Sequence, residues 1–158
     1  TYATSLALAA GLSSDEAEHI EKAALFHDLG KIAVAQEILR MRTTQLSKAQ
    51  TLELRRHPEI GYNILRSVDE YAPITEAILY HHERYDGLGF PRGLKGSEIP
   101  ISARIIAVAN TWANFTGPNA AYECVSKQVA TSTLQSMRET QLDPSLVDIF
   151  LSKVVRRR

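Results

Sequence analysis

The chain has 158 residues, of which 44% are hydrophobic and 23% charged, and its 18 basic and 18 acidic side chains balance. These values are typical of one soluble globular domain, and zero net charge argues against general binding to DNA. Since the chain has no apolar run long enough to enter a membrane and only one cysteine, Cys124, we expect a cytoplasmic domain over residues 1–158 without an internal disulfide. It starts within an apolar pattern at Thr1, so we expect it to be a piece of a longer protein.

The first half of the chain has helical periodicity. The pattern predicts a helix that ends before Gly11, a helix from Ser13 to about Asp28, a short helix or turn over 34–40, a helix from Ser47 to Leu65, and a helix from Pro73 to about His82. Ser13 and Ser47 are typical N-cap residues. Pro58 lies inside the fourth of these helices, where it predicts a kink.

A loop divides this half from the second. Residues 85–97 contain four glycines and one proline, which is typical of irregular structure. Helices are predicted from Pro100 to Gly117, over 119–138 and over 144–155, the last beginning at Asp143-Pro144. No strand is predicted, so the fold class is all-α, with about seven or eight helices.

Four of the five histidines share a helix face with apolar residues three and four positions away. They are His27, His57, His81 and His82; the fifth, His19, lies on a polar face and is expected to have no role. One inward-facing histidine is usually a hydrogen-bonded core residue, but four in a small domain all need partners for their ring nitrogens. With Asp28 beside His27, the set suits iron, zinc or manganese.

Two metals bridged by an aspartate and held roughly 3.5–4 Å apart are the arrangement used for phosphoester cleavage. Lys31 lies three residues after Asp28 and is placed to offset phosphate charge. Arg104 is expected either to do the same or to pair with a surface acid. The loop adds three basic residues, Arg84, Arg92 and Lys95, beside glycines whose amides can approach a phosphate closely.

These residues stand in motifs that resemble a known family. His27-Asp28-Leu29-Gly30-Lys31 resembles the HDxGK signature of the HD hydrolase superfamily. His57-Pro58 followed by Gly61, and the segment from His81 to Pro91, resemble the histidine segment and the HHE…DGxGYP stretch of its HD-GYP subgroup. The likeness continues through Leu94-Lys95-Gly96, Ile99-Pro100 and residues 103–109, and in total it covers about residues 8–116.

The resemblance implies a compact, all-α HD-type bundle that forms the C-terminal part of a bacterial signalling protein. It implies a phosphodiesterase that hydrolyses cyclic di-GMP to pGpG or GMP with divalent metals, most often iron or manganese, with a GGDEF-domain protein and a second copy of the chain as candidate partners. The implied metal ligands are His27, Asp28, His57, His81, His82 and Asn110. The implied catalytic residues are Asp28 and Lys31, and substrate contacts are expected from Lys31, Arg84, Asp86, Gly87, Gly89, Phe90, Arg92, Lys95 and Arg104.

The sequence departs from the family pattern in several places. Phe90 replaces the tyrosine of GYP, Asn110 and Asn114 replace two aspartates, residues 118–122 lack an expected arginine, and Thr1–Ala10 lacks an expected upstream ligand. An amide binds a divalent cation less strongly than a carboxylate, so a mono- or binuclear site is expected. Two hypotheses follow: an active phosphodiesterase, with activity reduced by Asn110, and a degenerate domain that binds nucleotide or a partner without chemistry. A hydrolase of another nucleotide is a third, which the glycine-rich loop disfavours.

Overall fold

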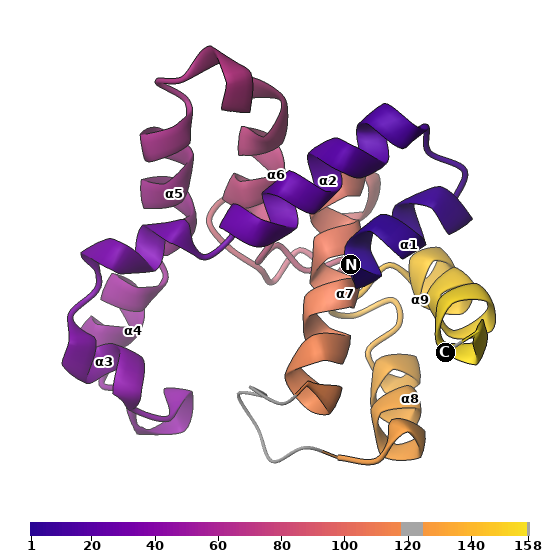
Figure 1. Cartoon of the computed structure of the whole chain (residues 1–158). Helices are drawn as coiled ribbons and strands as arrows, with labels where there is room; N and C mark the ends of the chain where they lie inside the picture. The colour runs from indigo at the N-terminus through magenta and orange to yellow at the C-terminus, as the bar shows by residue number, and fades with distance from the viewer. Residues whose placement is uncertain (118–124, 158) are drawn as a thin grey trace.

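The computed structural model describes residues 1–117 and 125–157, and these residues form α-helices and short turns without a β-strand (Figure 1). The α-helices are α1 Tyr2–Ala9, α2 Ser14–Phe26, α3 Gln36–Arg40, α4 Lys48–Leu54, α5 His57–Leu65, α6 Thr75–Tyr80, α7 Ile101–Thr116, α8 Lys127–Ser136 and α9 Pro144–Ile149. The 3₁₀ turns are Leu29–Ala33, Thr43–Gln45, Asp69–Ile74, Gly96–Glu98 and Val155–Arg157, and a π-helical turn covers Phe150–Val154. The all-α prediction is confirmed.

Local hydrogen bonds explain where the helices begin. The Ser13 hydroxyl accepts from the Glu16 amide, and the Glu16 carboxylate accepts from the Ser13 amide at 2.8 Å. Ser47 and Gln50 form the same reciprocal pair at the start of α4. Each pair satisfies two amides that a helix N-terminus leaves without partners, so both predicted starts lie where the caps require them.

The single helix predicted from Ser47 to Leu65 is wrong, because the structure divides it into α4 and α5 at Arg55 and Arg56. Pro58 has no amide hydrogen and its ring crowds the preceding turn, so it is tolerated only in the first turn of a helix. It lies at the second position of α5. The break places His57 at the start of α5.

Several helices are shorter than predicted. Helix α2 ends at Phe26 and α6 at Tyr80, so His27, Asp28, His81 and His82 lie in the turns that follow. The predicted last helix becomes α9 followed by the π-helical turn. Helix α8 begins at Lys127, and the predicted helix start near 119 lies outside the described residues. Cys124 and the divergent segment 118–122 lie outside the described residues, as does Arg158.

Helix α7 runs through the middle of the molecule and contacts α1, α2, α6, α8 and α9 (Figure 1). Its Trp112 is buried and packs edge-to-face against Phe150 of the C-terminal segment and Tyr2 of α1, with ring centroids 5.6 and 6.5 Å away. Large aromatic residues packed in this way contribute much of the buried apolar area of a core. Of the helices in the described ranges, none combines the length and apolar character that a membrane span needs.

Candidate metal centre

Three histidine rings are oriented by the helix turns from which they project. The Nδ1–H groups of His27, His57 and His81 each donate to the carbonyl oxygen three residues earlier in the chain. The acceptors are Ala24 at 2.8 Å, Leu54 at 2.7 Å and Ile78 at 2.6 Å. Because a carbonyl oxygen can only accept, each of these rings carries its proton on Nδ1 and leaves Nε2 as a free lone pair.

The free nitrogens converge beside one carboxylate. One ligand atom each from Asp28, His57, His81 and His82 lies within 4.8 Å of the others. His57 Nε2 is 3.4 Å from His81 Nε2 and 3.3 Å from Asp28 Oδ1, and His27 Nε2 is 3.5 Å from Asp28 Oδ2. We call these five residues the histidine cluster. The structure thus brings together all the predicted ligands of the first three motifs.

The donor set fits a divalent cation. Two Nε2 lone pairs that face each other at 3.4 Å repel unless a proton or a metal ion lies between them. The Nε2 atom of His27 is buried and has no hydrogen-bond partner among the described residues. A buried polar atom left in this way costs free energy, and a metal bond would remove that cost. Imidazole and carboxylate ligands suit iron, manganese and zinc.

The electrostatic environment favours the protonation states that metal ligands need. Burial, and then the neighbouring rings of His82 and His27, lower the pKa of His81 well below its usual value. Burial and then His57 lower the pKa of His82 to about 3. Burial raises the pKa of Asp28, but the neighbouring side chains of His57, His27 and Lys31 outweigh it, so the net shift is downward. At neutral pH the cluster therefore offers neutral imidazoles at His81 and His82 and an ionised carboxylate at Asp28.

A close backbone contact sets the distance between Asp28 and His57. A Cβ atom on Gly30 would lie 1.9 Å from the His57 carbonyl oxygen and 2.7 Å from the Gly61 amide nitrogen. Only glycine lets the Leu29–Ala33 turn approach the start of α5 this closely. Lys31, in the same turn, donates to Asp28 Oδ2 at 2.7 Å and remains partly exposed.

A buried carboxylate organises the glycine-rich loop (residues 85–97). Glu83 is 4% exposed, and its oxygens accept from the backbone amides of Arg92, Gly93 and Leu94 at 2.7, 3.1 and 3.1 Å. The sequence pattern does not assign this role to Glu83, although an acid followed nine residues later by a glycine turn is a weak signal for it. Glu83 therefore holds the loop against the end of α6.

The loop returns to the histidine cluster through Phe90. The Phe90 amide donates to the His82 carbonyl at 3.2 Å, and the two rings stack with centroids 4.8 Å apart and planes inclined by 19°. A Cβ on Gly89 would lie 2.3 Å from the Arg84 amide nitrogen, so this residue must be small. Gly87 has φ +84°, a conformation that glycine adopts without strain.

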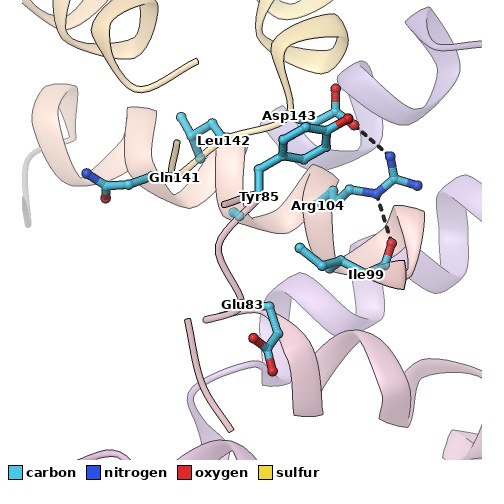
Figure 2. A pocket seen from close by; sticks show the side chains of 8 residues that line it. Glu83, Tyr85, Ile99, Arg104, Gln141, Leu142 and Asp143 are labelled. Atoms are coloured by element: carbon cyan, nitrogen blue, oxygen red, sulfur yellow. Dashed lines mark hydrogen bonds and ion pairs between the residues drawn. The ribbon is translucent and has the colours of Figure 1, made fainter. Parts of the chain in front are cut away.

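The predicted cationic contacts divide into two groups. Arg84 is paired with Asp86 by two hydrogen bonds, of 3.0 and 2.5 Å, while Arg92 and Lys95 are exposed. Arg104 donates to Asp143 at 2.6 Å and to the Ile99 carbonyl at 2.9 Å, in a small pocket that Glu83 also lines (Figure 2). Of the two roles left open for Arg104, the structure shows an ion pair, but its partner Asp143 is buried rather than on the surface.

The two asparagines lie on α7. Asn110 and Asn114 are both half-buried, and their side chains have no hydrogen-bond partner in the part of the chain that the structure describes. The residues that converge within 4.8 Å come from the turns around α2, α5 and α6. The prediction that Asn110 is a metal ligand thus rests on the sequence motif alone.

The chain resembles known proteins in sequence. The sequence model of a family described as HD domain matches residues 1–146. The chain belongs to the HD-domain family. This HD-domain protein is 38% identical over 143 residues to the cyclic di-GMP phosphodiesterase response regulator RpfG of Xanthomonas campestris pv. campestris, a match that covers 89% of this chain and 38% of the relative. It is 31% identical over 152 residues to 3'3'-cGAMP-specific phosphodiesterase 2 of Vibrio cholerae, covering 95% and 29%.

Two solved structures share the fold. An HDG"Y"P protein from Bdellovibrio bacteriovorus superposes with a TM-score of 0.74 at 18% identity, over 94% of this chain and 47% of the other. A cyclic GMP-AMP phosphodiesterase of Vibrio cholerae gives 0.71 at 16% identity, over 97% and 42%. The HD-domain chain thus spans less than half the length of each of these four proteins. The resemblance to the HD hydrolase superfamily is confirmed.

Proposed function

We propose that the chain carries a metal-dependent phosphodiesterase site that hydrolyses cyclic di-GMP to pGpG or GMP. The observation that carries the proposal is the convergence of the Asp28, His57, His81 and His82 ligand atoms within 4.8 Å, together with the buried Nε2 of His27, which has no hydrogen-bond partner among the described residues. The names of the curated relatives support the substrate class, since they describe enzymes of cyclic di-GMP and of 3'3'-cGAMP.

The histidine cluster would hold the ions, with Asn110 as a further oxygen ligand. Iron and manganese are the candidates, in a mono- or binuclear site, because the set is dominated by imidazole and has one carboxylate. Divalent ions bound there would supply Lewis acidity toward a phosphoryl oxygen and lower the pKa of a water.

The chain's own residues would bind and orient the substrate. Lys31 is held beside Asp28 and keeps part of its surface exposed, so it can offset phosphate charge at the edge of the cluster. Arg92 and Lys95 are exposed on the loop that Glu83 holds in place, and Phe90 lies against His82. Arg84 and Asp86 form an internal pair, so their proposed part is to shape the loop around Gly87 and Gly89.

Purified protein, loaded under anaerobic conditions with Fe(II) or with Mn(II), tests the proposal. We expect release of pGpG or GMP from cyclic di-GMP and metal bound to the chain. Parallel assays with 3'3'-cGAMP measure the substrate preference. The Asp28→Asn variant removes the only carboxylate that converges on the histidines within the described residues, and it should lose both metal and turnover. A metal-loaded parent that cleaves neither nucleotide would contradict the proposal.

The second candidate function is a degenerate domain that binds nucleotide or a partner protein without chemistry. Asn110 and Asn114 favour it, because they stand where the family pattern has carboxylates and have no hydrogen-bond partners among the described residues. In that case Asn110→Asp creates turnover that the parent lacks. Substantial turnover by the parent excludes this candidate.

Partners and location are proposed on the family resemblance alone. We expect a cytoplasmic protein that pairs with a GGDEF-domain protein and associates with a second copy of itself. Light scattering on the purified chain, with and without a GGDEF domain, measures both associations. A monomer at every concentration, unchanged by the added domain, contradicts both.

A further inference from the structure

Most basic residues around the site are already paired within the protein. Lys31 pairs with Asp28, and Arg84 pairs with Asp86. Arg104 pairs with the buried Asp143, and Arg92 lies 4.0 Å from Glu59. A cation that already has a carboxylate partner gives up an existing interaction when it binds a phosphate. These residues therefore bind a phosphate less strongly than an unpaired cation would.

Arg55 differs from all of them. It lies in the break between α4 and α5, two residues before His57, and its side chain is exposed. Its guanidinium carbon is 5.0 Å from the centroid of the Phe90 ring, and it has no acidic partner among the described residues. The His82 imidazole stacks on the same phenyl ring. The Phe90 ring thus contacts both Arg55 and His82, which is a member of the histidine cluster.

Stacking holds the guanidinium in place without neutralising it. A cation over an aromatic face is attracted by the negative charge of that face, and its N–H groups stay free to donate. A planar guanidinium presents donors in a geometry that matches two phosphate oxygens. The stack does not need the hydroxyl that Phe90 lacks, because the attraction comes from the ring face.

We propose that Arg55 binds a phosphodiester of the cyclic dinucleotide that is not being cleaved. This inference rests on the proposed function. A cyclic dinucleotide carries two phosphodiesters in one ring, and the reacting one must reach the histidine cluster. Among the described interactions Arg55 contacts the Phe90 ring and no member of that cluster, so it reaches a different part of the same ligand.

The test compares Arg55→Ala with Arg56→Ala, a neighbouring exposed arginine that has no contact with Phe90 among the described interactions. Loss of one charge-assisted contact predicts that Arg55→Ala raises KM for cyclic di-GMP about tenfold, with kcat and bound metal unchanged. Arg56→Ala should match the parent. Arg55→Lys keeps the charge but loses the planar stack, so it should fall between them.

A second substrate separates binding from a structural role. Bis(4-nitrophenyl) phosphate has one phosphodiester, so its hydrolysis should be the same in Arg55→Ala and the parent. An unchanged KM for cyclic di-GMP, an equal loss on both substrates, or a loss of bound metal would each overturn the proposal.

Failure of the proposed function gives a different result. If the metal-loaded parent cleaves nothing, calorimetric titration with cyclic di-GMP decides the role of Arg55. Binding by the parent that is about tenfold weaker in Arg55→Ala supports the proposal without catalysis. Absence of binding by the parent, or equal affinity of the two proteins, overturns it.

Discussion

The histidine cluster and the glycine-rich loop are held in place by hydrogen bonds of two different kinds. In the cluster, the rings of His27, His57 and His81 are each fixed by a carbonyl three residues earlier in the chain. In the loop, backbone amides bind the buried carboxylate of Glu83, and the amide of Asp86 donates to the Thr140 carbonyl at 2.8 Å. The first kind of bond is local in sequence, and the second joins distant segments.

The difference separates the roles of two neighbouring side chains. His82 contributes a ligand atom to the cluster, whereas Glu83 turns to the loop and binds three amides. Both would serve as ligands by residue type alone. Their surroundings give them different roles, because the carboxylate of Glu83 already accepts hydrogen bonds from three backbone amides. Substitutions in the cluster and in the loop therefore test how far the two regions are independent.

The largest effect is expected in the cluster itself. His57→Gln removes the nitrogen that lies between Asp28 and His81, so bound metal and phosphodiesterase turnover should fall at least about 100-fold, since even changes behind a metal ligand cost 10–100-fold. Elemental analysis and a nucleotide assay measure both. The matched variant His19→Gln should retain metal and activity, and a similar loss in both variants would mean that the cluster is not the metal site.

The next effect tests the backbone contact that brings the cluster together. In Gly30→Ala, the new Cβ would lie 1.9 Å from the His57 carbonyl oxygen, so the turn must move away from α5, at a cost in unfolding free energy of about 3 kcal/mol. Urea denaturation measures this. In Gly61→Ala the nearest atom is the Ile78 Cγ2 at 3.2 Å, so the loss should be smaller. A larger loss of stability in Gly61→Ala than in Gly30→Ala would show that the contact between Gly30 and His57 does not constrain the packing of the turn against α5.

Glu83→Gln alters the loop without touching the cluster. It keeps the size of the side chain but removes the charge that three amides share, which should lower the unfolding free energy by about 2 kcal/mol while bound metal stays constant. Glu98→Gln is the matched control, because this exposed carboxylate accepts from one amide, that of Lys95. Loss of metal in Glu83→Gln would instead identify Glu83 as a ligand.

The smallest effect concerns the Arg84–Asp86 pair of the loop. The hydrogen bond from Arg84 lowers the pKa of Asp86 from 3.8 to about 2. The stability that this carboxylate contributes is present above its ordinary pKa and is lost as the pH falls through the lowered value. Asp86→Asn should therefore flatten the dependence of unfolding free energy on pH between these two values. Arg84→Gln should have the same effect, and the double variant no more than either; additive effects would mean that the two residues act separately.

The sequence alone determined the features that depend on local spacing. Helical periodicity predicted an all-α domain, and serine caps predicted the starts of α2 and α4. The four inward-facing histidines were separated from His19 because residues three and four apart share a helix face. Asp28 and Lys31 were identified from their place beside His27, and their mutual hydrogen bond spans one turn. Each of these inferences needs only neighbours within a few residues.

Tertiary structure decided which polar groups already had partners. Arg104 and Asp143 are far apart in the sequence and pair in the fold, while Arg55 and Phe90 meet only because the loop returns over His82. Periodicity cannot reveal such contacts, because they depend on how the chain closes over long distances. Tertiary structure also decided the approach of Gly30 to His57. This approach brings Asp28 and His57, which lie in separate motifs, into one cluster. Sequence thus predicted which side chains could bind a metal ion, and the packing of distant segments decided which charges remain available to a ligand.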